Sequence, residues 1–206
     1  MTLFESILQQ YGTNEPILSS EITFQAYSRP WIYKQLNQLC EEGRIVRYEK
    51  GIYYIPTQTP FGPSLLNPRK VIERKYISQG GDTVGYYSGV ALQNQLRLTT
   101  QMPNVIEIYT NNETTHVRDV YVGKQKVLLR KARTKITASN ADVLSFLELM
   151  NELKTETLDD EKKAILTGLI AEWNITRKDI TTYAPFFPDK AMRNLIESEV
   201  IYSVAQ

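Results

Sequence analysis

Side chains that can read or approach a nucleic-acid duplex are concentrated between residues 28 and 38. Arg and Lys can hydrogen-bond the edge of guanine, and Gln can do the same with adenine. Their spacing places them on the first turns and outer face of one predicted helix. A solvated helix face is the alternative, because any exposed helix carries polar side chains. The candidate contact residues of this helix are Ser28, Arg29, Trp31, Lys34, Gln35 and Gln38.

A basic hairpin, "RIVRYEKGIYYIP", follows directly at residues 44–56. Ile45 and Ile55 mark its two buried ends, and Lys50-Gly51 supplies a turn that tolerates positive φ. Contacts to phosphate would give affinity and salt dependence but little sequence information. The candidate phosphate contacts are Arg44, Arg47 and Lys50.

A second basic run, "GKQKVLLRKARTK", occupies residues 123–135 and contains no acid. On a strand, Lys131, Arg133 and Lys135 would project to one side. We expect a second surface that adds phosphate contacts. Two alternatives remain open: an edge strand kept polar against aggregation, and a docking site for the acidic helices after residue 136. The residues of this second basic surface are Lys124, Lys126, Arg130, Lys131, Arg133 and Lys135.

Hydrophobic spacing predicts the elements that position the first set of residues. Residues 3–11 form one helical face that stops at Gly12. A short second helix is expected after Ser19 or Ser20, with Ile22 and Ala26 within it. The third helix runs from Ser28 to Gly43, with Pro30 in its first turn and Ile32, Leu36, Leu39 and Cys40 buried. Helix, short helix, turn, helix and hairpin is the order of a winged helix-turn-helix.

The rest of the chain mixes helices and strands after a proline-rich stretch. Residues 57–68 contain three prolines and no charge, and are typical of a linker. Helices are expected over 68–79 and 86–96, a strand over 104–111, and a hairpin over 116–133 with its turn at Gly123-Lys124. Helical spacing then returns from Ser139 onward. The prediction is an α+β protein: a winged helix-turn-helix at 1–56, a linker at 57–68, and a mixed α/β domain with C-terminal helices at 69–206.

Composition favours binding over catalysis. The net charge of +1 conceals a first segment (1–56) at −1, a middle (57–135) at +7 and an end (136–206) at −5. The N-terminal module alone would therefore bind DNA weakly. One His and one Cys, His116 and Cys40, offer no zinc set and no nearby dyad, and the glycines of "SQGGDTVG" lack the Gly-Lys-Ser/Thr of a phosphate loop. We therefore expect that the chain is not an enzyme and holds no cofactor or metal. A single cysteine cannot form an internal disulfide, which suits a reducing cytoplasm. No apolar run approaches the length of a membrane helix.

Three stretches resemble the AbiEi-type antitoxins, the transcription-regulating half of bacterial type IV toxin–antitoxin pairs. "IYKQLNQLCEEGRIVRYEKGIYYIP" is similar to the family's recognition helix and wing, and "NPRKVIERKYI" to the helix that opens its second domain. The most specific stretch is "GYYSGVALQNQLRLTTQMPNVIEIYTN", in which a Tyr-Ser-Gly segment leads into a strand. Together they cover most of residues 1–135.

The resemblance implies a DNA-binding autorepressor with a separate antitoxin domain. Carried over by position, residues 28–38 and 44–53 would contact operator DNA, Tyr53 included. The family's functional partner is a nucleotidyltransferase-like toxin, and the resemblance leaves open whether the two touch. The toxin's own Gly-Ser…Asp-x-Asp motif is absent from this chain. A protein-interaction module, or a stand-alone regulator without a toxin, is the alternative.

Overall fold

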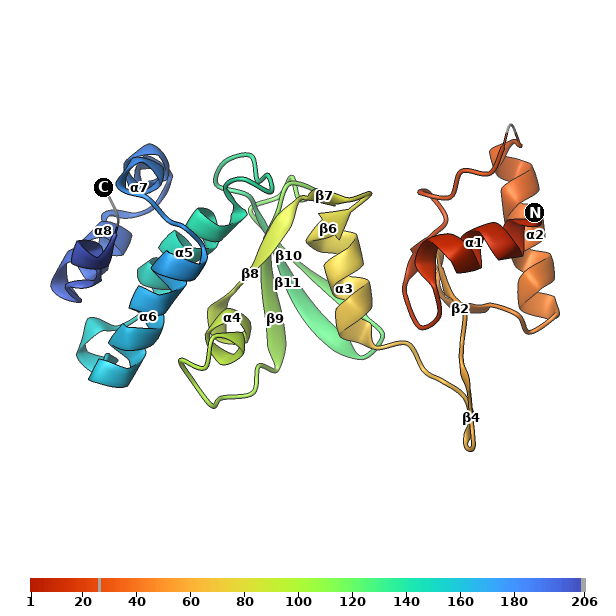
Figure 1. Cartoon of the computed structure of the whole chain (residues 1–206), viewed down its shortest axis with the longest axis horizontal. Coiled ribbons are helices and arrows are strands. Elements are labelled where there is room, and N and C mark those ends of the chain that lie inside the picture. The colour runs from red at the N-terminus through yellow and green to blue at the C-terminus, as the bar shows by residue number, and fades with distance from the viewer. Residues whose placement is uncertain (26, 205–206) are drawn as a thin grey trace. The chain divides into compact units, whose positions relative to one another are not determined.

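The computed structural model describes residues 1–25 and 27–204, and the chain divides into two compact units, Met1–Lys75 and Tyr76–Gln206 (Figure 1). Helices and strands occur in both units, which confirms the α+β class. Within the described residues, no helix has both the length and the apolar character that a membrane crossing requires.

The first unit consists of two main helices, a small sheet and a short hairpin. Strand β3 lies at the centre of the sheet and pairs antiparallel with β1 and β2. Gly51, at φ +81°, turns the chain between β2 and β3 as expected. The elements of this unit are α1 (Leu3–Tyr11), β1 (Ile17–Leu18), α2 (Arg29–Glu41), β2 (Val46–Glu49), β3 (Ile52–Tyr54), β4 (Gln58–Thr59), β5 (Gly62–Pro63) and all but the last residue of α3 (Pro68–Tyr76).

Two of the helices predicted for this unit, α1 and α2, form where the apolar spacing places them. Helix α1 begins with a capping box, in which the Thr2 hydroxyl accepts from the Glu5 N–H and the Glu5 carboxylate accepts from the Thr2 N–H. Its buried face packs with the predicted stripe of α2 and with the inner face of the sheet. The buried residues of this core are Leu3, Ile7, Ile17, Ile22, Phe24, Ile32, Leu36, Leu39, Ile45, Tyr53 and Ile55.

The prediction of a short second helix after Ser19 or Ser20 is wrong over the residues described. Residues 19–25 form turns and irregular backbone, and Ala26 lies outside the described residues. Ile22 and Phe24 are both buried, an alternation that a helix would not bring to one face. Carbonyls that a helix would pair with its own N–H groups are bonded instead by the Arg29 side chain.

The division between the units falls after Lys75 rather than within residues 57–68. Those residues form the β4–β5 hairpin, which is bonded to the first unit through Tyr54 and Asn14. Helix α3 is held to the same unit by three ion pairs. They join Lys70 to Glu15, Arg74 to Glu21 and Lys75 to Glu49.

The second unit is built on a four-stranded sheet in the order β10-β11-β9-β8. Strands β11 and β9 are parallel, and the other pairs are antiparallel. The predicted strand and hairpin are confirmed. The strands are β6 (Ser78–Gln79), β7 (Asp82–Thr83), β8 (Gly85–Ser88), β9 (Val105–Thr110), β10 (Val117–Val122) and β11 (Gln125–Lys131). The helices are α4 (Gly89–Gln95), α5 (Ala141–Glu152), α6 (Asp160–Glu172), α7 (Arg177–Tyr183) and α8 (Asp189–Glu197), with 3₁₀ turns η1 (Thr155–Thr157), η2 (Ala184–Phe186) and η3 (Val200–Ser203).

One predicted helix of this unit is partly wrong. Of the segment expected to be helical over 86–96, the first three residues lie in β8 and the helix begins at Gly89. Tyr86 pairs with Tyr109 of β9, and their rings stack with centroids 5.5 Å apart. Aromatic pairs across neighbouring strands stabilise a sheet, which favours extended backbone at this position.

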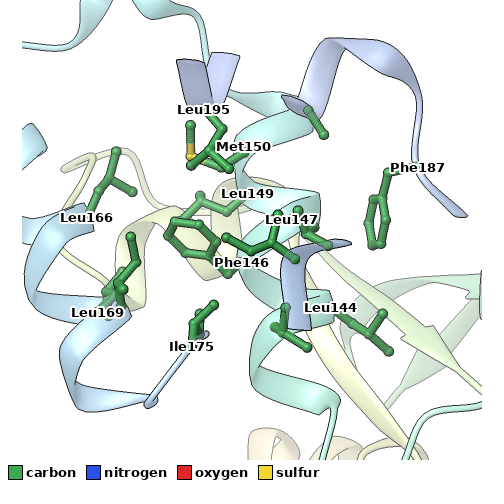
Figure 2. Packing of buried hydrophobic residues seen from close by; sticks show 14 of the residues in the cluster. Leu144, Phe146, Leu147, Leu149, Met150, Leu166, Leu169, Ile175, Phe187 and Leu195 are labelled. Carbon is green, nitrogen blue, oxygen red and sulfur yellow. The ribbon is translucent and has the colours of Figure 1, made fainter. Parts of the chain in front are cut away.

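Helix α5 is the centre of the second hydrophobic core. It contacts β8 and α4, and also α7 and α8. Figure 2 shows Phe146 of α5 among leucines from α5 and α6, with Leu195 of α8 close to Met150. Because α5 is buried along almost its whole length, its few polar side chains must find partners inside the unit.

Candidate nucleic-acid interface

The outer face of α2 is the part of the predicted site that the structure leaves most accessible. Ser28 caps the helix with extended backbone, and Pro30 occupies its first turn. Burial of Ile32, Leu36 and Leu39 on one side turns the opposite side outward. Lys34 and Gln38 are exposed there, whereas Gln35 is half-buried. The Gln38 amide donates to the Glu42 carboxylate at 2.9 Å.

Lys34 makes no ion pair within the described parts of the chain. An exposed Lys without an acidic partner can donate to a phosphate or to a guanine edge. Gln38 must exchange its bond to Glu42 for any bond to a base. Lys34 is therefore the strongest single contact candidate on this helix.

Arg29 has a structural role that sequence analysis did not anticipate. Its guanidinium donates to the carbonyl oxygens of Ser19, Ile22 and Ser20 at 3.0, 3.0 and 2.8 Å. These bonds tie the irregular segment before α2 to the first turn of the helix. The Arg29 side chain is therefore not free to contact a duplex.

Trp31 belongs to an aromatic stack at the start of α2. Its ring lies 3.9 Å from that of Tyr27 and 6.0 Å from that of Phe24, measured between centroids. Tyr27 is 47% exposed, whereas Phe24 is buried. Phe24 and Tyr27 were not among the predicted site residues, although the aromatic residues four positions apart at 27 and 31 were a signal in the sequence. The stack presents the Tyr27 ring to solvent at the start of α2.

The predicted phosphate contacts of the β2–β3 hairpin differ in availability. The Arg44 guanidinium lies 3.7 Å above the Phe4 ring and 3.8 Å from the Glu42 carboxylate, so it is partly engaged. Arg47 and Lys50 are exposed, and in the described residues neither forms an ion pair. Tyr53 is only 4% exposed and belongs to the core. The prediction that Tyr53 contacts DNA is therefore wrong.

The first unit carries a modest positive charge. It has nine Lys and Arg residues against seven Glu, a net charge of +2. Four of these cations lie on α3, and three of the four are paired with Glu15, Glu21 and Glu49. Apart from Arg29, the exposed cations that form no ion pair in the described residues are Lys34, Arg47 and Lys50 on α2 and the β2–β3 hairpin, and Arg69 on α3.

Half of the cations of the second basic surface are neutralised by acids of their own unit. Lys126 pairs with Asp119 of β10 at 2.7 Å, and Arg130 pairs with Glu107 of β9 at 3.0 Å. Strand β11 ends at Lys131, so the expected one-sided projection of Lys131, Arg133 and Lys135 along a strand does not occur. Of the predicted six, Lys124, Lys131 and Lys135 remain exposed.

Arg133 points inward and holds a buried acid of α5. Its Nε and one terminal nitrogen donate to the two Glu148 oxygens at 2.6 and 3.0 Å, and it also donates to the Tyr109 hydroxyl at 3.2 Å. The Tyr109 and Phe187 rings flank the guanidinium. Glu148 is 1% exposed. The structure therefore shows Arg133 docking an acidic helix, α5, rather than lying free to contact DNA.

A second acid of α5, Glu152, lies one helical turn beyond Glu148. Its two carboxylate oxygens accept from the Gly89 N–H at 2.8 and 3.1 Å. Burial, together with the negative charge of Glu148, raises the pKa of Glu152 to about 7. Burial likewise raises the pKa of the nearby Tyr86 hydroxyl well above its ordinary value. Glu148 and Glu152 occur in a helix whose sequence is mostly apolar, and this was the only signal that the sequence offered for them.

No group of three His, Cys, Asp or Glu side chains in the parts of the chain that the structure describes is arranged to hold a metal ion. Burial raises the pKa of the Cys40 thiol, which disfavours the reactive thiolate.

Comparison with protein families matches one family model to residues 18–177, from β1 to the first residue of α7. The chain belongs to DUF6088. This family is described as one of unknown function. The DUF6088 match includes α2, the β2–β3 hairpin, the four-stranded sheet and helices α5 and α6. No curated protein matches the chain.

Proposed function

We propose that the first unit is a winged helix-turn-helix variant that binds double-stranded DNA, with α2 as its recognition helix and the β2–β3 hairpin as its wing. The order α1–β1–α2–β2–β3 and the sheet order β1-β3-β2 support this proposal. An irregular segment fixed by Arg29 takes the place of the short second helix. The observation that carries the proposal is the exposed, unpaired cations Lys34, Arg47 and Lys50 on one helix and the hairpin that follows it.

We further propose that the chain is a transcriptional autorepressor and antitoxin of a type IV system, countering a nucleotidyltransferase-like toxin. Support for this part comes from the sequence resemblance to AbiEi-type antitoxins. This proposed role requires no catalytic step, cofactor or metal of the chain. The cytoplasm is the compartment in which such a regulator would act.

A protein-interaction role for the same unit is the second candidate. The exposed Tyr27 ring and the modest charge of +2 favour it, because protein interfaces are enriched in aromatic side chains. A stand-alone regulator without a toxin would use the DNA-binding surface unchanged. Removing the Lys34 and Gln38 side chains therefore distinguishes a DNA-binding role of this unit from a protein-binding role.

The test is the double substitution Lys34→Ala with Gln38→Ala, assayed by mobility shift on the DNA upstream of the gene. We expect specific binding to be lost, at about 1–3 kcal/mol for each good base contact. Lys124→Ala with Gln101→Ala removes the same side-chain types from exposed positions of the second unit and should bind normally. Equal binding by both double variants, with folding intact by circular dichroism, would reject α2 as the recognition helix.

A further inference from the structure

The β4–β5 hairpin presents the most exposed large apolar side chains of the first unit. Phe61 is 100% exposed at its tip, and Leu65 is 89% exposed just after it. Figure 1 shows the hairpin projecting from the rest of the first unit. Neither side chain contributes to the core, so burial within the unit does not explain them.

The hairpin is ordered by its own hydrogen bonds. The Thr59 hydroxyl donates to the Gly62 carbonyl at 2.7 Å and accepts from the Phe61 N–H at 3.2 Å. At the base, the Ser64 hydroxyl accepts from the Thr57 N–H at 2.9 Å. A tip held in this way loses little conformational entropy when it binds. These bonds suit a preformed contact element rather than a passive connection.

The hairpin lies at the end of the sheet opposite the β2–β3 turn. Strand β3 runs from that turn, Lys50-Gly51, to Tyr54, and the chain then continues into β4. A partner at Phe61 therefore need not compete with one at Lys50.

The charge of the segment narrows the class of partner. Residues 57–68 contain no charged side chain, in a chain of which 23% of residues are charged. Nucleic acids and anionic lipid surfaces are bound mainly through Lys and Arg, which this segment lacks. In a twofold contact, residues near the axis meet their own copies, so any charge there would face a like charge. A neutral, apolar tip avoids that repulsion.

We propose that the β4–β5 hairpin is a self-association element, which packs Phe61 and Leu65 against the same hairpin of a second copy of this chain. An aromatic side chain buries about 150–250 Å², whereas a standard interface takes roughly 800 Å² from each partner. The contact is therefore weak and concentration-dependent, and depends on a few apolar side chains.

Sedimentation velocity of the full chain, from low micromolar concentration upward, tests the proposal. Wild type should show a rising average sedimentation coefficient, and Phe61→Ala should weaken dimerisation at least about tenfold. Folding should be unchanged, because the side chain is fully exposed. Met102→Ala is the control: it removes a 69% exposed apolar side chain from the second unit and should dimerise like wild type.

A photo-cross-linking amino acid, p-benzoylphenylalanine, placed at position 61 identifies the occupant. In a mixture of isotopically light and heavy chains, cross-links should join position 61 of one chain to residues 57–66 of another. Three results would overturn the proposal: a monomer at all concentrations, equal dimerisation by wild type and Phe61→Ala, or cross-links to the apolar groove lined by Ile180, Met192 and Ile196.

Discussion

The α2 helix with the β2–β3 hairpin and the basic run at 123–135 look alike in sequence but use their cations differently. Lys34, Arg47 and Lys50 are exposed and, within the described chain, have no acidic partner. In the second run, Lys126, Arg130 and Arg133 are each paired with an acid of the second unit, and only Lys124, Lys131 and Lys135 remain exposed. The two runs differ in where the acids lie. Those that neutralise the second run come from neighbouring strands and from α5, so a local count of cations overstates the positive surface.

The difference also determines which cations of each unit can be substituted without loss of stability. The first unit can lose its exposed cations with little effect on folding, because they touch solvent. Arg133 cannot be lost in this way, since its removal would leave Glu148 charged and buried. The chain has two tryptophans, Trp31 in the first unit and Trp173 in the second, which allows each unit to be followed separately.

The largest expected effect is that of Arg133→Ala on the stability of the second unit. Breaking a buried ion pair by removing one partner costs about 3–5 kcal/mol. In a Trp31→Phe background, the fluorescence of Trp173 during urea unfolding reports this unit alone. Lys131→Ala, at an exposed neighbouring position, should change the unfolding free energy by no more than about 0.5 kcal/mol.

Arg133→Lys sharpens the same comparison and covers the case in which Arg133→Ala does not fold. Lysine keeps the charge but cannot reproduce the two-pronged bond to Glu148, so its stability should fall between wild type and alanine. If Arg133→Lys and Lys131→Ala were both indistinguishable from wild type, the inward role of Arg133 would be refuted.

A smaller effect is expected from pH acting on Glu152. Its pKa in the folded protein is about 7, above the ordinary value of 4.5, so the folded state binds a proton more tightly than the unfolded state does. The stability of the second unit should therefore be highest below about pH 4.5 as far as this group is concerned, and fall as pH rises through about 7. The loss is at most about 3 kcal/mol.

Glu152→Gln tests this effect, because glutamine keeps an acceptor for the Gly89 N–H and cannot titrate. Urea midpoints from Trp173 fluorescence should converge at acidic pH, and the variant should be the more stable at about pH 8. Glu156→Gln, an exposed acid nearby, serves as the control and should follow wild type. Parallel pH profiles for wild type and Glu152→Gln would contradict the raised pKa.

Much of the fold was predictable because the decisive patterns are local. The apolar stripe of α2, with Pro30 in its first turn, and the Gly51 and Gly123 turns of both hairpins were correctly placed. The segment before α2 was not, because its backbone is fixed by Arg29 from beyond it. Tyr86 was assigned to a helix because its strand is stabilised by Tyr109, a partner distant in sequence.

Only part of the candidate interface was predictable. Helical periodicity correctly placed Lys34 and Gln38 on an exposed face. Strand alternation could not show that Tyr53 faces the core while Arg47 opposite it is exposed. Nor could residues 123–135 show that Glu148, on a later helix, would capture Arg133.

The most direct test of the central claim, that α2 and the β2–β3 hairpin rather than residues 123–135 contact DNA, is the salt dependence of operator binding. Each lost phosphate contact reduces the slope of log K against log salt by about 0.9. Arg47→Ala with Lys50→Ala should therefore reduce the slope by about two, while Lys124→Ala with Lys131→Ala should leave it unchanged. A slope reduced only by the second pair would contradict the account.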